Sequence, residues 1–149
     1  MLTWDGAPLP RMVDGGETYP KARQPDWPVA DFIVGNPPFT GGKDVRSRMG
    51  DGYAEALWAA HPKMNPSADF VMYWWDVAAS LLTAKGTRLR RFGLVTTNSI
   101  TQVFQRKVLE RHLSGNAPVS VIFAIPDHPW TKVGRDAAAV RIAMTVVAT

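Results

Sequence analysis

The stretch "ADFIVGNPPFTGGK", residues 30–43, decides the fold of this protein. It opens with an apolar run, residues 30–35, which lies between Pro28 and a glycine-containing turn and predicts a short strand buried on both faces. An Asn and two prolines follow directly. Each proline fixes its own φ angle, so the backbone becomes stiff at the point where the strand ends. The sequence therefore predicts a rigid polar turn at the end of a buried strand.

The rest of the chain alternates between strand-like and helix-like segments. Further strands are predicted at residues 91–99, 119–125 and 137–149, and helices at 53–61, 67–86 and 101–115. Residues 40–52 are polar and glycine-rich and predict a mobile loop. This order predicts an α/β fold with a mostly parallel sheet flanked by helices. The link between the last two strands is short for a crossover, so the last strand is predicted to pair antiparallel with the third.

One helix start and one aromatic run carry local predictions. Ser67 is a plausible N-cap of the second helix, and Asp69 would support its first turn. Tyr73, Trp74 and Trp75 follow one another on this helix. Adjacent helical residues point about 100° apart, so the aromatic run predicts core packing and not a single stacking surface.

Composition limits the possible compartments and partners. The chain has 149 residues and a net charge of +4, which favours anionic partners only mildly. It contains no cysteine, which fits a reducing compartment and predicts a cytoplasmic protein. No apolar run is long enough for a membrane helix, so no membrane partner is expected. Residues 1–28 are rich in Pro and Gly and predict an extended connection, leaving 29–149 as the folded domain.

Polar residues follow the first two strands of the predicted sheet. Asn36 follows the first strand, and the run Thr96 to Ser99 ends the second. In an open α/β sheet, ligands bind outside the carboxyl ends of the strands, so both groups are predicted to line one edge. Asn98 and Ser99 are therefore candidates for lining a pocket there, or for capping the next helix.

The Asn-Pro-Pro-Phe turn suits the chemistry of an exocyclic amine. The nitrogen lone pair of such an amine is delocalised into the base, which makes it a poor nucleophile. Two fixed acceptors, the Asn36 side-chain oxygen and the Pro37 carbonyl, would each take one N–H and free the lone pair for attack on a sulfonium methyl group. Pro38 would rigidify the turn, and Phe39 would stack on a flipped base. An ordinary strand-ending turn is the alternative reading of the same residues.

These residues resemble a known family. "DFIVGNPPF" is similar to motif IV of the class I S-adenosylmethionine-dependent DNA amino-methyltransferases, and "ADFVMYWWDVA", "FGLVTTNSI", "RKVLERHL" and "AAVRIAMTVV" follow in the order found in large bacterial restriction–modification enzymes. The resemblance covers about residues 29–149 and implies the carboxyl half of a Rossmann-like catalytic domain. It implies that Asn36, Pro37 and Phe39 are catalytic, that Pro38 rigidifies the turn and binds substrate, and that Asn36 and Pro37 also contact the cofactor. Asn98 is predicted to bind substrate from its position at the end of the second strand, beside Asn36. Phe39 favours adenine N6 over cytosine N4 as the target.

The chain departs from the family at the methyl-donor site. In the family, a glycine-rich loop and acidic residues at the ends of the next two strands hold the methyl donor. This sequence has no Gly-x-Gly before residue 30 and no counterpart of those strands. Asp5 is either a remnant of these donor contacts or a solvated loop residue. S-adenosylmethionine is the implied cofactor and DNA the implied partner, but the isolated chain is predicted to have little or no activity. Loss of the front strands would also expose a sheet edge, which predicts self-association.

Two other readings stay open, a non-catalytic interaction module or remnant and a fragment of an RNA or protein-glutamine methyltransferase. No metal site is predicted, because His61, His112 and His128 lack ligand spacing. A basic cluster precedes the second strand and is interpreted as a solvated loop at the end opposite the site. The cluster consists of Lys85, Arg88, Arg90 and Arg91.

Overall fold

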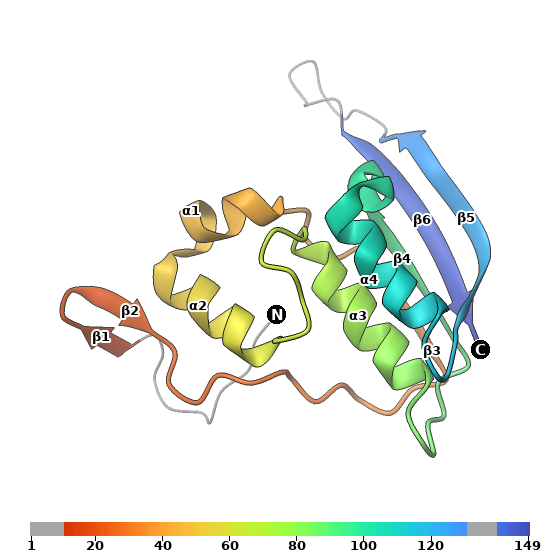
Figure 1. Ribbon diagram of the computed structural model, residues 1–149, viewed down its shortest axis with the longest axis horizontal. Helices are drawn as coiled ribbons and strands as arrows, with labels where there is room; N and C mark the ends of the chain where they lie inside the picture. Colours follow the sequence, from red (N-terminus) through yellow and green to blue (C-terminus); the bar gives the residue numbers. More distant parts are fainter. Residues whose placement is uncertain (1–10, 131–139) are drawn as a thin grey trace.

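The structure is a computed structural model that describes residues 11–130 and 140–149. Its central sheet has four strands, in the spatial order β3 (Phe32–Gly35), β4 (Arg91–Thr97), β6 (Arg141–Ala148) and β5 (Ser120–Pro129) (Figure 1). β3 runs parallel to β4, whereas β6 is antiparallel to both β4 and β5. Three of these strands thus point the same way and β6 is reversed. This confirms the predicted α/β class and the antiparallel pairing of the last strand.

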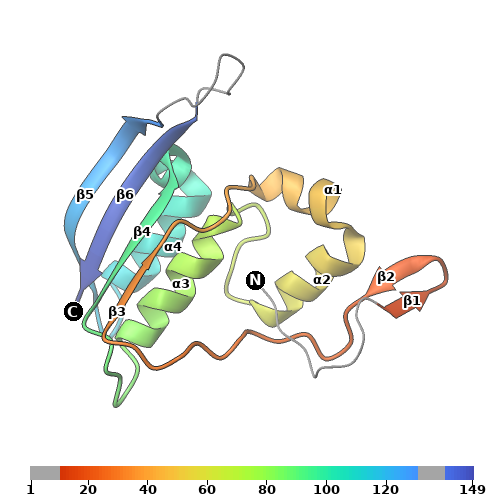
Figure 2. The ribbon, with the colours of Figure 1, turned by 180° about the vertical axis from the view of Figure 1, so that it is seen from behind.

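Two helices, α3 (Val71–Leu82) and α4 (Val103–Leu113), cover one face of this sheet (Figures 1 and 2). The Trp75 ring lies edge-on to Phe92 of β4, with 5.4 Å between the ring centroids. Its indole N–H donates to the Thr145 hydroxyl of β6 at 3.3 Å, so the tryptophan is both packed and hydrogen-bonded. Tyr73 and Trp75 are fully buried and Trp74 is half-buried, which confirms core packing for the aromatic run.

The other face of the sheet is not covered by any helix of the described residues (Figure 2). The strand register places Val34, Gly93, Val146 and Phe123 in one row across the four strands, and paired residues share a face. Val34 is 88% exposed and Phe123 is 51% exposed. The prediction that the first strand is buried on both faces is therefore wrong for the part of the chain that the structure describes.

A small β-hairpin lies within the segment predicted as an extended connection. Its strands are β1 (Arg11–Val13) and β2 (Gly16–Thr18), and its turn residues Asp14 and Gly15 have φ angles of 50° and 78°. Positive φ at both turn residues is the type I′ geometry, for which Asp-Gly is a favoured pair. The hairpin packs on α2 (Asp51–Ala60), where a Cβ on Gly52 would overlap the Glu17 carbonyl. Glycine is thus required at this contact.

Three local predictions are corrected by the structure. Residues 40–52 do not form a mobile loop, because they fold into the 3₁₀ turn η1 (Gly42–Asp44) and the short helix α1 (Val45–Met49) with Val45 buried. α3 begins at Val71, so Ser67 does not cap it. The predicted strand over residues 91–99 ends earlier, because β4 stops at Thr97 and the short turn η2 (Asn98–Thr101) separates it from α4. Asp5 and the predicted start of the last strand at residue 137 lie outside the described residues.

Candidate functional site

The Asn-Pro-Pro-Phe turn leaves the sheet at the carboxyl end of β3. Asn36 is exposed, and its side chain makes no hydrogen bond to the described residues. Pro37 is buried and Pro38 is exposed, so the two prolines of the turn differ in their exposure to solvent. All three line a shallow cleft together with Val34 and Trp74. The amide of Asn36 is thus available to a ligand at the edge predicted from the sequence.

Phe39 has a different setting from the three residues before it. Its ring is half-buried and packs against the hydrophobic core, and it is not among the residues that line the cleft beside Asn36. Part of the ring surface is therefore committed to packing. The stacking role assigned to Phe39 stays a prediction.

Asn98 follows the end of β4 and contacts β5, the strand farthest from β3 in the sheet. Its amide donates to the Asp127 carboxylate of β5 at 3.4 Å, and Asp127 also accepts from the Arg141 guanidinium of β6 at 2.6 Å. Hydrogen bonds from Arg141 hold the pKa of Asp127 below its ordinary value. No hydrogen bond among the described residues joins Asn98 to Asn36. The two predicted site residues share the edge of the sheet without contacting each other.

A second polar group at this edge centres on Asp69, which sequence reasoning placed in the first turn of a helix. The Asp69 carboxylate instead accepts hydrogen bonds from the Gly42 backbone N–H, the Thr97 hydroxyl and the Ser99 hydroxyl. These donors come from the segment after the turn and from the end of β4. Ser99, a pocket candidate from the sequence, is therefore held by Asp69 beside Thr97.

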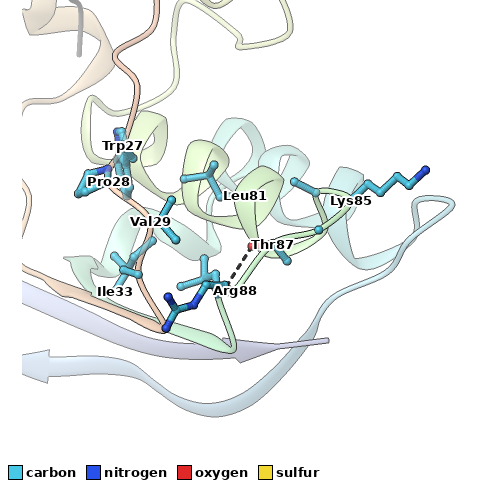
Figure 3. Close-up of a pocket in the computed structure, with 12 residues that line it drawn as sticks. Trp27, Pro28, Val29, Ile33, Leu81, Lys85, Thr87 and Arg88 are labelled. Carbon is cyan, nitrogen blue, oxygen red and sulfur yellow. Dashed lines mark hydrogen bonds between the residues drawn. The ribbon is translucent and has the colours of Figure 1, made fainter.

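Another cleft lies at the amino end of β3, opposite the turn (Figure 3). Its apolar wall includes Trp27, Val29 and Leu81, and two members of the basic cluster, Lys85 and Arg88, also line it. Arg88 forms an exposed ion pair with Asp31 at 3.0 Å. The position of this cluster, away from Asn36, agrees with the prediction.

The described residues contain no group of three or more His, Cys, Asp or Glu side chains that could hold a metal ion. His61 is buried edge-on against Tyr73, and His112 contacts Asp76 at 2.6 Å. Among the same residues, none of the helices combines the length and apolar character that a membrane span needs.

Comparisons with known proteins point to one family. A family model described as "MmeI, DNA-methyltransferase domain" matches residues 11–149. Among solved structures, the chain is similar to a Type IIL restriction–modification enzyme, MmeI, in complex with DNA, at 28% identity and a TM-score of 0.60. The match covers 78% of this chain and 15% of that chain, so the protein spans a small part of the enzyme that it resembles. A search of the curated proteins found no match.

Proposed function

The chain belongs to the MmeI DNA-methyltransferase domain family, and we propose on this premise that it is part of a site-specific DNA methyltransferase. The proposed reaction transfers a methyl group from S-adenosylmethionine to the exocyclic N6 of a flipped adenine in DNA. The proposed partner is therefore DNA, as in the complex of the similar MmeI structure.

One observation carries this proposal, the state of the Asn36 side chain. It stands at the carboxyl end of a parallel strand, exposed and without a hydrogen bond to the described residues. Ligands of open α/β sheets bind at this end of the strands. Both residues that follow are prolines, which have no N–H that could occupy the amide oxygen. The amide oxygen of Asn36 is thus an acceptor with an open side, on a backbone that the two following prolines stiffen.

The turn would act on the amine by hydrogen bonding and position. The Asn36 oxygen and the Pro37 carbonyl would each accept one amine N–H, which draws the nitrogen toward tetrahedral geometry and exposes its lone pair. The nitrogen would then form a bond to the methyl carbon as the carbon–sulfur bond breaks. The electron pair of that bond would stay on the sulfur, which becomes a neutral thioether, and one amine proton would pass to water. The two acceptors stabilise the positive charge that develops on the amine during this step. Phe39 would contact the base with the part of its ring that is not packed in the core.

The residues of the turn fit one end of the methyl donor. S-adenosylmethionine supplies an activated methyl group on a sulfonium, and the cleft beside Asn36 and Pro37 offers oxygen acceptors next to apolar surface from Trp74 and Val34. No residue that lines this cleft in the described part of the chain carries a carboxylate for the ribose hydroxyls. We therefore propose that this chain contacts the methyl-bearing end, and that the purified 149-residue chain alone has little or no activity.

The test uses the coding sequence of this chain, together with any coding sequence contiguous with it, expressed in a bacterial host that lacks DNA methylation. Modified bases are located in the host DNA by sequencing that distinguishes N6-methyladenine from N4-methylcytosine. N6-methyladenine at one recurring sequence, lost in Asn36→Ala, is the expected result. N4-methylcytosine in its place would overturn the adenine assignment. Unmodified DNA from the wild-type gene would overturn the enzyme proposal and favour a non-catalytic module.

A further proposal concerns the free edge of β3. No described strand pairs with it on the side away from β4, and Val34 and Phe32 on this strand are 88% and 56% exposed. Unpaired edges with apolar side chains pair readily with other chains. We propose that the purified chain self-associates through β3. Sedimentation should show a dimer that a Val34→Lys substitution dissociates, whereas a monomer at all concentrations would contradict this proposal.

A further inference from the structure

Asp69 stands just before helix α3, yet its carboxylate does not serve the helix. The helix begins at Val71, and its N-terminus receives no hydrogen bond from a capping side chain. The half-buried Asp69 side chain turns instead toward the carboxyl end of the sheet. A carboxylate at a helix start that is not used for capping is free to organise another part of the fold.

The two carboxylate oxygens of Asp69 join segments that are distant in the sequence. Oδ1 accepts the Gly42 N–H at 3.1 Å, and Oδ2 accepts the Thr97 hydroxyl at 3.2 Å and also the Ser99 hydroxyl. Hydrogen bonds to an ionised acceptor are stronger than neutral ones. Asp69 therefore ties the segment after the Asn-Pro-Pro-Phe turn to the end of β4.

The neighbouring backbone strengthens the same attachment. The Phe70 N–H donates to the Thr40 carbonyl at 2.8 Å, and Thr40 is buried. A Cβ on Gly42 would lie 2.8 Å from the Ala68 carbonyl oxygen and nearer still to that of Ser67. The backbone at Gly42 is therefore in direct contact with the backbone of the segment before α3. The segment is held at Thr40 by a backbone bond and at Gly42 by a carboxylate.

These attachments fix the turn from its downstream side. Upstream, Gly35 is the register partner of Leu94 in the parallel pair of β3 and β4. Downstream, the first residue after Phe39 is Thr40, which the Phe70 N–H holds. The four residues of the turn are therefore suspended between two anchors, and Asp69 completes the second one. Preorganised acceptors need such anchoring, because a displacement of about 1 Å at a reacting group costs about 100-fold in rate.

We propose that Asp69 is a positioning residue for methyl transfer, which acts by holding the segment Thr40–Gly42 so that Asn36 and Phe39 meet the target base in a fixed geometry. This inference rests on the function proposed above. Asp69 is not proposed to touch the base or the methyl donor.

The experiment compares Asp69→Ala, Asp69→Asn and the control Asp76→Asn. Asp76 lies on α3, the helix that follows Asp69, but contacts α4, away from the turn. In the purified 149-residue chain, backbone hydrogen exchange is measured by NMR at Gly42. Asp69→Ala should raise the exchange rate there by about 10- to 160-fold, which corresponds to the roughly 1.5–3 kcal/mol that a hydrogen bond to a charged group contributes. Asp76→Asn should leave Gly42 exchange unchanged when measured well below the unfolding temperature.

The second readout is the kinetics of DNA methylation by the protein purified from the expression host described above. Asp69→Ala should lower kcat by about 10- to 100-fold with little change in KM for DNA. Asp69→Asn should recover most of kcat, because its amide can accept from Gly42 and donate to the hydroxyls of Thr97 and Ser99. Asp76→Asn should lower the unfolding temperature without this loss of kcat.

The outcomes separate the two proposals. If Asn36→Ala abolishes methylation while Asp69→Ala retains kcat within about twofold of wild type, the positioning role is overturned and the methyltransferase proposal stands. If Asn36→Ala retains full activity, the proposed function of the turn fails, and the Gly42 exchange still reports whether Asp69 anchors the segment. Unchanged exchange at Gly42 in Asp69→Ala would overturn the anchor itself.

Discussion

Asp69 lies just before α3 and Asp76 lies in the middle of this helix, about two helical turns further along. Both are aspartates, but their carboxylates contact different parts of the fold. Asp69 contacts two loops and a strand end at the edge of the sheet. Asp76 is buried between two helices, where it accepts from Arg111 and from the His112 ring. Asp69 thus connects segments around the proposed site, and Asp76 connects α3 to α4 in the helical layer that supports the sheet.

The two environments also differ electrostatically. Burial of the Asp76 carboxylate opposes its ionisation, but the hydrogen bond from His112 and the charges of Arg111 and His112 outweigh burial and hold the pKa of Asp76 below its ordinary value. Arg111 also donates to the Lys63 carbonyl at 2.5 Å, so the cluster joins α3, α4 and the loop before α3. Variants of the two residues should therefore separate loss of stability from loss of site geometry.

The largest expected effect is that of Asp76→Ala. Removing one partner of a buried ion pair leaves Arg111 and His112 without the carboxylate that pairs with both, and the free energy of unfolding should fall by about 3 kcal/mol. Urea unfolding followed by tryptophan fluorescence measures this change. Asp76→Asn, which keeps the shape and one oxygen, should lose less. A loss below about 1 kcal/mol in Asp76→Ala would show that the cluster is not a main contact between α3 and α4.

Gly42→Ala tests the Asp69 side of the comparison. The added methyl group would overlap the backbone of Ser67 and Ala68, which is not a flexible side-chain end that can move away. We expect a loss of about 1–3 kcal/mol in unfolding free energy, typical of overpacking. In Gly42→Ala, the backbone hydrogen exchange rate should rise at residue 42 but not in the middle of α3. Gly50→Ala is the control for steric overlap, because no atom lies within 4 Å of the added carbon. The φ of 85° at Gly50 adds a backbone strain of its own, so the comparison is made on hydrogen exchange at residue 42, which Gly50→Ala should leave unchanged.

The sequence predicts the elements that depend on local pattern. The apolar runs of β3, β4, β5 and β6 and the helical spacing of α3 and α4 are strong signals, and the structure contains all of them. The sequence pattern does not predict the hairpin, although Asp14-Gly15 is a favoured pair for a hairpin turn. The prolines on either side of it favour an extended segment instead. The helix α1 was missed because its five residues lie between glycines.

The Asp69 group could not be predicted from the sequence alone. Its hydrogen bonds span 27 to 30 positions, and the donors are a glycine N–H and two hydroxyls, which carry no distinctive pattern. Asp69 also follows the ordinary preference for an acidic residue at a helix start, which favoured a local role. The exposed position of Asn36, by contrast, could be predicted, because ligands of open α/β sheets bind at the carboxyl ends of the strands and Asn36 follows such an end.

A smaller effect is expected from acid. The pKa of Asp76 is lower in the folded chain than the value of about 3.9 for an unfolded Asp, so its contribution to stability is complete above pH 3.9 and is lost as pH falls through the folded pKa. Urea unfolding at a series of pH values should show a steeper loss in wild type than in Asp76→Asn. Asp127, whose pKa is also lowered, is unchanged in both proteins and cancels in the comparison. Parallel curves would contradict the role of Asp76.

The smallest expected effect comes from Glu110, the neighbour of Arg111 on α4. Glu110 accepts from Arg106 at 3.1 Å in an i,i+4 pair, and both side chains are more than half exposed, at 57% and 58%. Water screens such a pair, so Glu110→Gln should change the unfolding free energy by about 0.5 kcal/mol or less, and high salt should remove the difference. Two ion pairs on consecutive residues of one helix thus differ in burial far more than in chemistry. If Glu110→Gln proved as destabilising as Asp76→Ala, burial would not explain why the Asp76–Arg111 pair stabilises the fold more than the Glu110–Arg106 pair. The stabilising role assigned to the buried Asp76 carboxylate would then need another physical basis.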